Sequence, residues 1–144
     1  MNWKAEAVKD LKNYPQRKES IENIKTRIKI LDEEFTSLRG ISTSDPVMGG
    51  FSRQEEKMLD NISERELLSF SLKIAEALVK LTEKGLEVLD KKEREVIEGF
   101  YINREGNHVD MLCEKLHFEK TRLYEIKDNA LRKFTIAMYG TVEI

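Results

Sequence analysis

Residues that turn or cross-link the backbone are scarce in this sequence. Its 144 residues include one cysteine, two prolines and seven glycines. A single cysteine excludes an internal disulfide and makes the reducing cytoplasm the expected location. So few turn residues argue against an all-β sandwich. The chain also lacks an apolar run of the roughly 18 residues that a membrane span needs, and its start lacks the apolar core of a signal peptide, so no membrane partner is expected.

Charge of one sign is not in excess either. Lys and Arg number 25 and Asp and Glu number 27, which gives a formal net charge of −2. This balance argues against a strongly basic protein that coats nucleic acid, and a DNA-binding role would need a local basic face. What the chain does have is 36% charged and 40% hydrophobic residues. This composition is typical of helix-rich proteins, so we predict an all-α fold.

An apolar seam that repeats every 3.5 residues runs through residues 16–39. It consists of Ile21, Ile24, Ile28, Leu31, Phe35 and Leu38. This period is typical of helices that pack knobs into holes. A shorter helix, from Asn2 to Leu11, is expected before it. The two helices should be separated at Asn13-Tyr14-Pro15, because proline begins helices more readily than it continues them.

A second seam with the same period follows. It consists of Leu68, Leu72, Ala75, Val79, Thr82, Leu86 and Leu89, and it is widened by Leu67, Ile74, Leu78, Leu81 and Val88. The capping-box spacings of Ser52 with Glu55 and of Ser63 with Glu66 offer two starts for this helix. A Ser- and Gly-rich stretch at 41–51 predicts a loop, so the economical arrangement is an antiparallel, coiled-coil-like hairpin. The heptads leave open whether the seams pair within one chain or between the chains of a homodimer.

The last third of the chain predicts a helix-turn-helix. Asp90 and Glu93 have capping-box spacing, so a helix should begin there and continue to about Ile102. A turn at 103–106, a short helix at 108–116 and a last helix at 119–138 follow. Their apolar contacts are expected from Leu112, Leu116, Phe118, Leu123 and Ile126, with Cys113 as the small residue at the crossing. In this motif the second helix lies in the DNA major groove.

This segment resembles region 4 of bacterial sigma factors. Leu89, the run Glu93-Arg94-Glu95-Val96-Ile97 and Phe100-Tyr101 are similar to the helix that opens that region, and Ala130-Leu131-Arg132-Lys133-Phe134 is similar to the end of its recognition helix. The resemblance implies a DNA-binding regulator of transcription, with RNA polymerase as a further partner. Two positions depart from the family: His117 stands where a glycine is frequent, and Glu119 stands where the helix cap is usually Ser or Thr.

The layout of the whole chain is similar to that of small phage regulators of the RinA and ArpU types. A Tyr-Pro near the start, a heptad hairpin, a Ser/Thr/Gly loop and a sigma-like end occur in the same order. This likeness implies a phage or prophage setting.

The exposed face of the last helix is the predicted DNA-binding site. It comprises Lys120, Thr121, Arg122, Tyr124, Glu125, Lys127 and Asp128, with Asn129 beside them. Arg122 could read guanine and Glu125 could accept a hydrogen bond from cytosine, whereas lysines contact phosphates. From Glu119 to Phe134 there are five basic and three acidic side chains, a balance of +2, against −3 for residues 51–106.

Other chemistry has little support in the sequence. Cys113 and His117 have the i, i+4 spacing that can share a metal, and His108 lies five residues before Cys113, but zinc sites need at least three well-placed ligands. We therefore expect no metal and no cofactor. No nucleophile with an orienting base is evident either, so we do not expect an enzyme.

The sequence thus predicts a helical hairpin at 1–89, a sigma-like helix-turn-helix at 90–139 and a tail at 140–144. The expected function is sequence-specific binding of double-stranded DNA in transcription regulation. Two alternatives stay open: a helical structural or interaction protein, and a terminase-like DNA-packaging subunit. The recognised DNA sequence, the sign of regulation, the oligomeric state and the exact phase of the recognition helix do not follow from the sequence.

Overall fold

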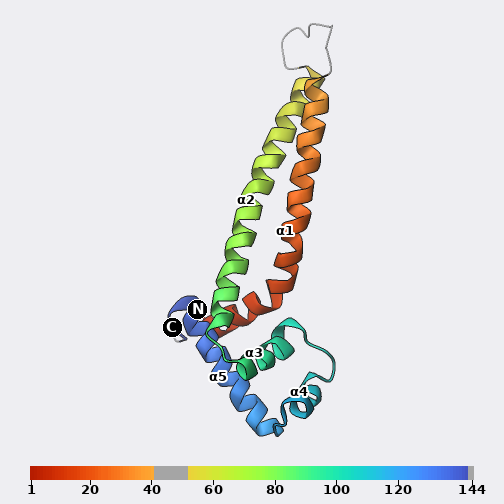
Figure 1. Ribbon diagram of the computed structural model, residues 1–144. Helices are drawn as coiled ribbons and strands as arrows, with labels where there is room; N and C mark the ends of the chain where they lie inside the picture. The colour runs from red at the N-terminus through yellow and green to blue at the C-terminus, as the bar shows by residue number, and fades with distance from the viewer. Residues whose placement is uncertain (41–51, 143–144) are drawn as a thin grey trace. The chain divides into compact units, whose positions relative to one another are not determined.

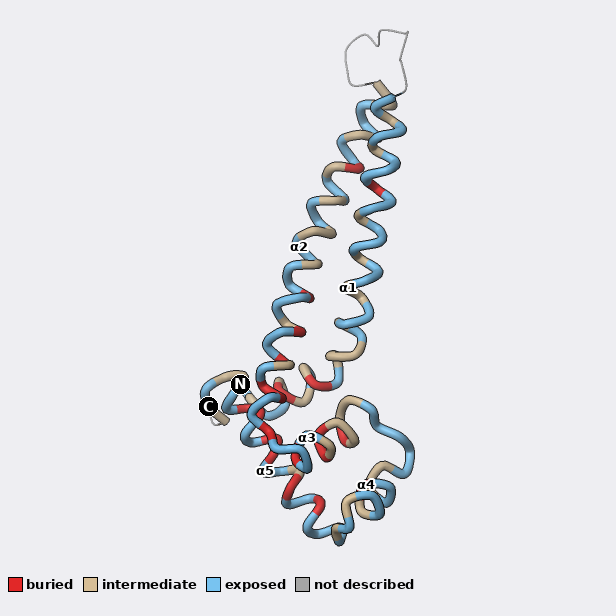
Figure 2. Tube along the Cα trace, in the orientation of Figure 1, coloured by how far each residue is buried: buried red, intermediate tan, exposed pale blue. Residues whose placement is uncertain are grey.

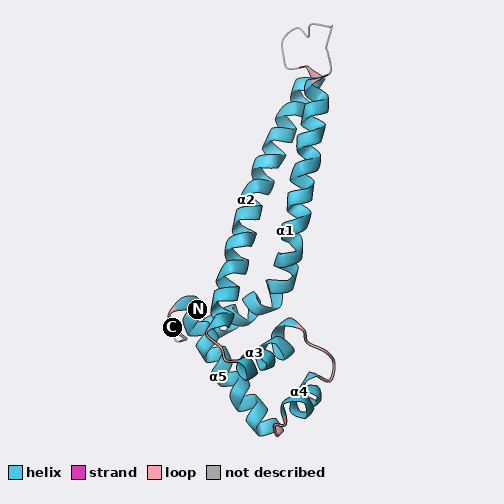
Figure 3. Ribbon diagram, viewed as in Figure 1, coloured by secondary structure: helices cyan, strands magenta, loops and turns pink. Residues whose placement is uncertain are grey.

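The computed structural model describes residues 1–40 and 52–142, and over these ranges it contains helices and no strand (Figures 1 and 3). The all-α prediction is therefore confirmed. The predicted loop at 41–51 and the last two residues of the predicted tail lie outside the described residues. The elements are α1 (Trp3–Arg39), α2 (Arg53–Glu87), α3 (Lys91–Ile97), the π-helical turn η1 (Glu98–Ile102), α4 (His108–Leu116) and α5 (Lys120–Tyr139).

The predicted break at Asn13-Tyr14-Pro15 is wrong. Helix α1 continues through Pro15, which lies inside it. An interior proline removes one backbone hydrogen bond and costs about 3 kcal/mol. Burial offsets this cost, because Ala7 and Leu11 are completely buried in the turns before the proline. Burying one leucine side chain contributes about 1.5–3 kcal/mol.

The boundary between the two parts of the chain also differs from the predicted one at 89/90. One unit combines residues 1–17 with the chain from residue 77 onward, and the other consists of residues 18–76. The start of α1 belongs with the C-terminal helices because Ala7 and Leu11 share their apolar core. Sequence periodicity assigned residues 2–11 to the hairpin because it does not show which element a buried helix faces.

The unit of residues 18–76 is built from the rest of α1 and the first part of α2, which run antiparallel. Asn61 donates from Nδ2 to the Leu31 carbonyl (2.9 Å), and Gln54 donates to the Leu38 carbonyl. Arg65 forms an ion pair with Asp32 (2.6 Å). Of the predicted seams, Leu31 and Ala75 are buried here, and the other members from these residues are half-buried. The widening residues Leu67 and Ile74 are instead exposed, so within the chain α2 uses only the narrower seam.

Helix α2 begins at the first of its two predicted starts. Ser52 accepts a hydrogen bond from the Glu55 backbone N–H (3.1 Å), and the Glu55 carboxylate accepts one from the Ser52 N–H (3.3 Å). The helix then continues through Ser63 without interruption.

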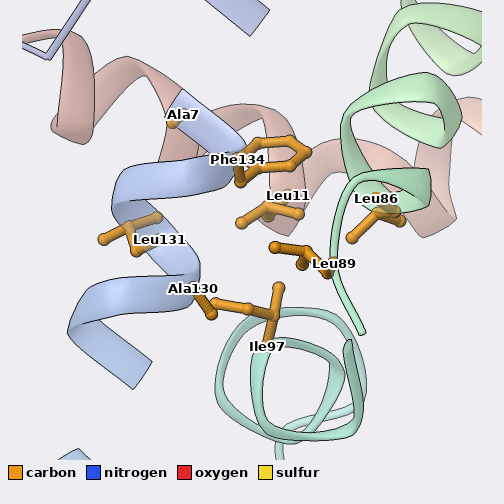
Figure 4. Packing of buried hydrophobic residues seen from close by; sticks show 8 residues of the cluster. All are labelled: Ala7, Leu11, Leu86, Leu89, Ile97, Ala130, Leu131 and Phe134. Atoms are coloured by element: carbon orange, nitrogen blue, oxygen red, sulfur yellow. The ribbon is translucent and has the colours of Figure 1, made fainter. Parts of the chain in front are cut away.

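The core of the other unit is a cluster of eight buried residues from α1, α2, α3 and α5 and the α2–α3 link (Figure 4). They are Ala7, Leu11, Leu86, Leu89, Ile97, Ala130, Leu131 and Phe134. Figure 2 shows that buried positions recur along α5. Those at Ala130, Leu131 and Phe134 belong to this core. At the end of α5, the Tyr139 ring lies against Trp3 with centroids 5.0 Å apart, and its hydroxyl donates to Asp10. Burial raises the pKa of Tyr139, and the bond to Asp10 adds to the shift.

Helix α3 begins as predicted. The Asp90 carboxylate accepts a hydrogen bond from the Glu93 N–H (2.8 Å), and the Glu93 carboxylate accepts one from the Asp90 N–H (3.1 Å). The helix ends in the π-helical turn, where the Asn103 N–H donates to the Glu98 carbonyl (2.7 Å).

Candidate nucleic-acid interface

Helices α4 and α5 are joined by a link of three residues, His117 to Glu119. His117 adopts the left-handed conformation, with φ 59° and ψ 43°, and it is the one residue other than glycine with positive φ among the described residues. The Phe118 N–H then donates to the Cys113 carbonyl (3.1 Å), which closes the end of α4. The tight link predicted at His117-Phe118 is therefore present, and histidine holds a conformation that glycine adopts at lower cost.

An apolar cluster fixes α4 and α5 against the end of α3 and the π-helical turn. Its buried members are Val96, Phe100, Leu112, Leu123 and Ile126, and Leu116, Phe118 and Cys113 pack against it. All five residues predicted to connect the two helices belong to this cluster. Leu123 and Ile126 of α5 are buried in this cluster, so the opposite side of that helix is exposed to solvent.

Helix α4 approaches the π-helical turn closely at Gly99, a residue that the sequence-based prediction does not include. A Cβ atom there would lie 2.7 Å from Cδ1 of Leu112. The glycine thus lets α4 pack directly on the π-helical turn. Sequence reasoning assigned the small-residue role to Cys113, which is half-buried at the same cluster. The sequence signal for this close approach is the single glycine between the buried residues Ile97 and Phe100.

Helix α5 begins at Lys120, one residue later than predicted. Glu119 is its N-cap in extended conformation, and its side chain makes no capping hydrogen bond. For α4 the predicted range is correct, but Asn107 likewise gives no side-chain cap.

Most of the predicted DNA-binding residues share the exposed side of α5. Exposed residues are Lys120, Thr121, Arg122, Tyr124, Glu125, Asp128 and Asn129. Lys127 differs from the prediction: its side chain is only 20% exposed and it pairs with Asp128 (3.1 Å). Its Nζ lies 5.6 Å from the Phe100 ring centre and 5.3 Å from that of Tyr124. Lys127 is therefore held against aromatic rings, where a cation is attracted to the ring face.

Arg122 and Glu125, the two predicted base readers, contact each other. Nη1 of Arg122 lies 3.2 Å from Oε2 of Glu125, and the two side chains are 61% and 57% exposed. An exposed ion pair of this kind contributes about 0–1 kcal/mol. A bidentate contact of arginine with guanine contributes about 1–3 kcal/mol, so the pair can open in favour of a base.

A hollow of about 530 Å³ borders this face at Arg122 and is lined by four cationic and two acidic side chains. Its cationic lining residues are Lys92, Arg122, Arg132 and Lys133, with Asn129 between them. Nζ of Lys92 lies 5.4 Å from the Phe118 ring centre. Sequence reasoning did not include Lys92, Arg132 and Lys133 in the site, because they lie outside the first turns of α5. The signal for Arg132 and Lys133 was the basic excess of α5, which does not include Lys92 of α3.

The acidic residues of the same hollow are already engaged. Lys133 pairs with Glu93 (2.9 Å), and this bond raises the pKa of Lys133. Asp90 is bound to the backbone at the start of α3, and the hydrogen bond from the Glu93 N–H lowers the pKa of Asp90. Asp90 and Glu93 therefore do not form ion pairs with the other three cationic residues of the hollow, which are Lys92, Arg122 and Arg132.

Another hollow of the same unit, of about 480 Å³, has the opposite character. Its charged lining residues are one lysine, Lys115, and four acidic residues from α3, the π-helical turn, the following turn and α4: Glu95, Glu98, Glu105 and Glu114. Carboxylates repel phosphates, so a nucleic acid would favour the basic hollow beside α5 over this one.

Comparison with known proteins assigns no family to this chain. No family model matches the chain, and neither curated proteins nor solved structures include a significant match to it. Over residues 1–40 and 52–142, no three side chains of metal-ligating type come together. In the same ranges, each helix is too short or too polar to cross a lipid bilayer.

Proposed function

We propose that this protein binds double-stranded DNA by placing the exposed face of α5 in the major groove, and that it regulates transcription by doing so. The observation that carries the proposal is the combination of a tightly linked α4–α5 pair, an exposed polar face on α5 and a basic hollow beside it. This is the arrangement that a helix-turn-helix uses to read DNA.

We expect two kinds of contact with DNA, one with phosphates and one with base edges. Lys120, Lys92 and Arg132 are suited to phosphates, because cationic side chains at the border of the face fix the helix on the duplex without reading its sequence. Arg122 and Glu125 lie between them near the start of α5, where recognition helices contact base edges. The ion pair between these two residues holds both side chains over the same part of the helix.

The likeness to sigma factor region 4 extends the proposal. It supports RNA polymerase as a further partner. The similar layout of the small phage regulators of the RinA and ArpU types supports a phage or prophage setting. Both additions follow from the sequence and not from the geometry of α5.

Binding to a random-sequence duplex tests the DNA-binding step. Fluorescence anisotropy over a series of salt concentrations should give an affinity that falls steeply with salt, because each phosphate contact releases counterions. Lys120→Glu should weaken this binding. Lys29→Glu, a matched change at an exposed lysine of α1, should leave it unaltered. An affinity that is absent, or independent of salt and of Lys120, would favour the helical interaction protein instead.

A further inference from the structure

Helix α2 carries a second apolar strip that its own chain leaves uncovered. The strip consists of Leu67, Phe70, Ile74, Ala77 and Leu81. All five are exposed, and Leu67, Phe70, Ile74 and Leu81 have exposed fractions of 66, 62, 44 and 50%. This strip is separate from the seam of Leu68, Leu72, Ala75 and Val79, which is half-buried or buried on the other side of the helix.

The spacing of the strip specifies what fits it. Its members are 3, 4, 3 and 4 residues apart, which is the repeat of a coiled-coil seam. A strip with this period matches a long helix that has the same repeat. Binding a globular partner or a flexible peptide would not require the period. A hollow lined by Ile62, Arg65, Glu66, Ser69, Phe70 and Lys73 borders the strip. Four of these, at 66, 69, 70 and 73, have the i, i+3, i+4, i+7 spacing of a hole that receives a side chain of a neighbouring helix.

We propose that the occupant is the same strip of a second copy of this chain, with the two α2 helices antiparallel. One register brings four of the five residues together: Phe70 lies opposite Ile74 of the second copy, and Leu67 lies opposite Ala77. Leu81 then lies opposite Ser63, a small polar residue. Large residues then meet smaller ones, as interdigitating layers require. A shift of the register by one heptad would place a charged residue opposite a leucine. In one direction Glu56 would lie opposite Leu81, and in the other Lys84 would lie opposite Leu67.

Charge selects the antiparallel orientation. In this register Glu66 lies beside Lys80 of the second copy, and the two-fold symmetry repeats the pair. Lys73 meets Lys73 of the second copy at the axis, so two pairs of opposite charge flank one contact of like charge. Glu66 and Lys80 are exposed, and over the described residues neither forms an ion pair within its own chain. A parallel pair would instead place Glu66 beside Ser71 and Lys80 beside Gly85, with no charge partner. Such flanking pairs set the orientation of coiled coils.

This self-association does not depend on DNA binding, so the full chain without DNA tests it. Sedimentation equilibrium should show a dimer that dissociates on dilution. Phe70→Glu should raise its dissociation constant by at least about 100-fold, because it puts a charge in the centre of the apolar contact. Ile30→Glu, at an exposed apolar residue of α1, is the matched control and should leave the dimer intact. Both residues are exposed, so circular dichroism should show unchanged helix content.

Reversing the charges tests the register. Glu66→Lys and Lys80→Glu should each weaken the dimer by about tenfold, and the double variant should restore it, because the pairs are then exchanged rather than lost. A monomer at all concentrations would overturn the proposal, whether or not another protein covers the strip. A dimer that Phe70→Glu leaves intact, or one that the double variant fails to restore, would overturn it as well.

Discussion

Phe134 of α5 lies directly against the backbone of Gly85 in α2. A Cβ atom at Gly85 would be 2.6 Å from Cε2 of Phe134 and 3.1 Å from the sulfur of Met138. Phe134 is completely buried and cannot move aside. This contact holds the later turns of α5 in the core, so that the earlier turns project from it with their polar face in solvent.

Gly85→Ala should therefore destabilise the protein. Overpacking a core costs about 1–3 kcal/mol, which exceeds the helix-propensity gain of about 1 kcal/mol from replacing glycine. Chemical denaturation followed by circular dichroism measures the difference. Gly106→Ala is the matched control, since nothing lies within 4 Å of a Cβ atom there. Equal stability of the two variants would show that α5 does not pack closely on Gly85.

His117→Gly should stabilise the link between α4 and α5. Glycine adopts the left-handed conformation without the steric cost that a Cβ atom adds, so we expect a gain of about 0.5–1 kcal/mol in the free energy of unfolding. His117→Val should have the opposite effect, because β-branched residues fit this conformation worst. Thermal unfolding of both variants measures it. If both variants change the stability in the same direction, the left-handed backbone conformation of His117 does not determine the effect.

Acid should weaken the start of α3 through Asp90. The pKa of this carboxyl lies below its ordinary value of 3.8, mainly because it accepts a hydrogen bond from the Glu93 N–H. A group whose folded pKa is lowered stabilises the fold above its unfolded pKa, and that contribution is lost as the pH falls through the folded pKa. Below about pH 4, the stability of the wild type should therefore fall more steeply than that of Asp90→Asn, which keeps an acceptor but does not titrate in this range.

The control for this prediction is Asp60→Asn, at an exposed aspartate of α2. Its acid denaturation curve should follow that of the wild type. If Asp90→Asn does so too, Asp90 does not contribute to the pH dependence.

Much of the fold could be predicted from local sequence signals. The capping residues Ser52 and Asp90 give the correct helix starts, and the 3.5-residue repeat gives the buried side of α2. These features depend on contacts between residues a few positions apart. The continuation of α1 through Pro15 and the burial of Ala7 among C-terminal residues could not be predicted, because they depend on contacts between distant segments.

The candidate site shows the same division. The exposure of Arg122 follows from helical periodicity, which puts it on the side opposite the apolar residues. The half-burial of Lys127 under the rings of Phe100 and Tyr124 depends on how the π-helical turn meets α5, and no short-range pattern reports that. Lys92 enters the basic hollow for a similar reason, since it comes from α3.

Lys120→Ala should weaken binding to all duplexes alike. If its side chain contacts one phosphate, the slope of log affinity against log salt should fall by about 0.9. Base preference should be unchanged, because phosphates carry no sequence information. A change in the preferred bases with an unaltered salt slope would instead assign Lys120 to the reading of bases.

The most direct measurement is selection of bound sequences from a random duplex pool, made in parallel with the wild type and with Arg122→Ala. We expect the wild type to enrich one motif, and Arg122→Ala to lose the preference at one base pair of that motif with a cost of about 1–3 kcal/mol. Absence of enrichment with the wild type, or an identical motif and affinity with the variant, would contradict the placement of α5 in the major groove.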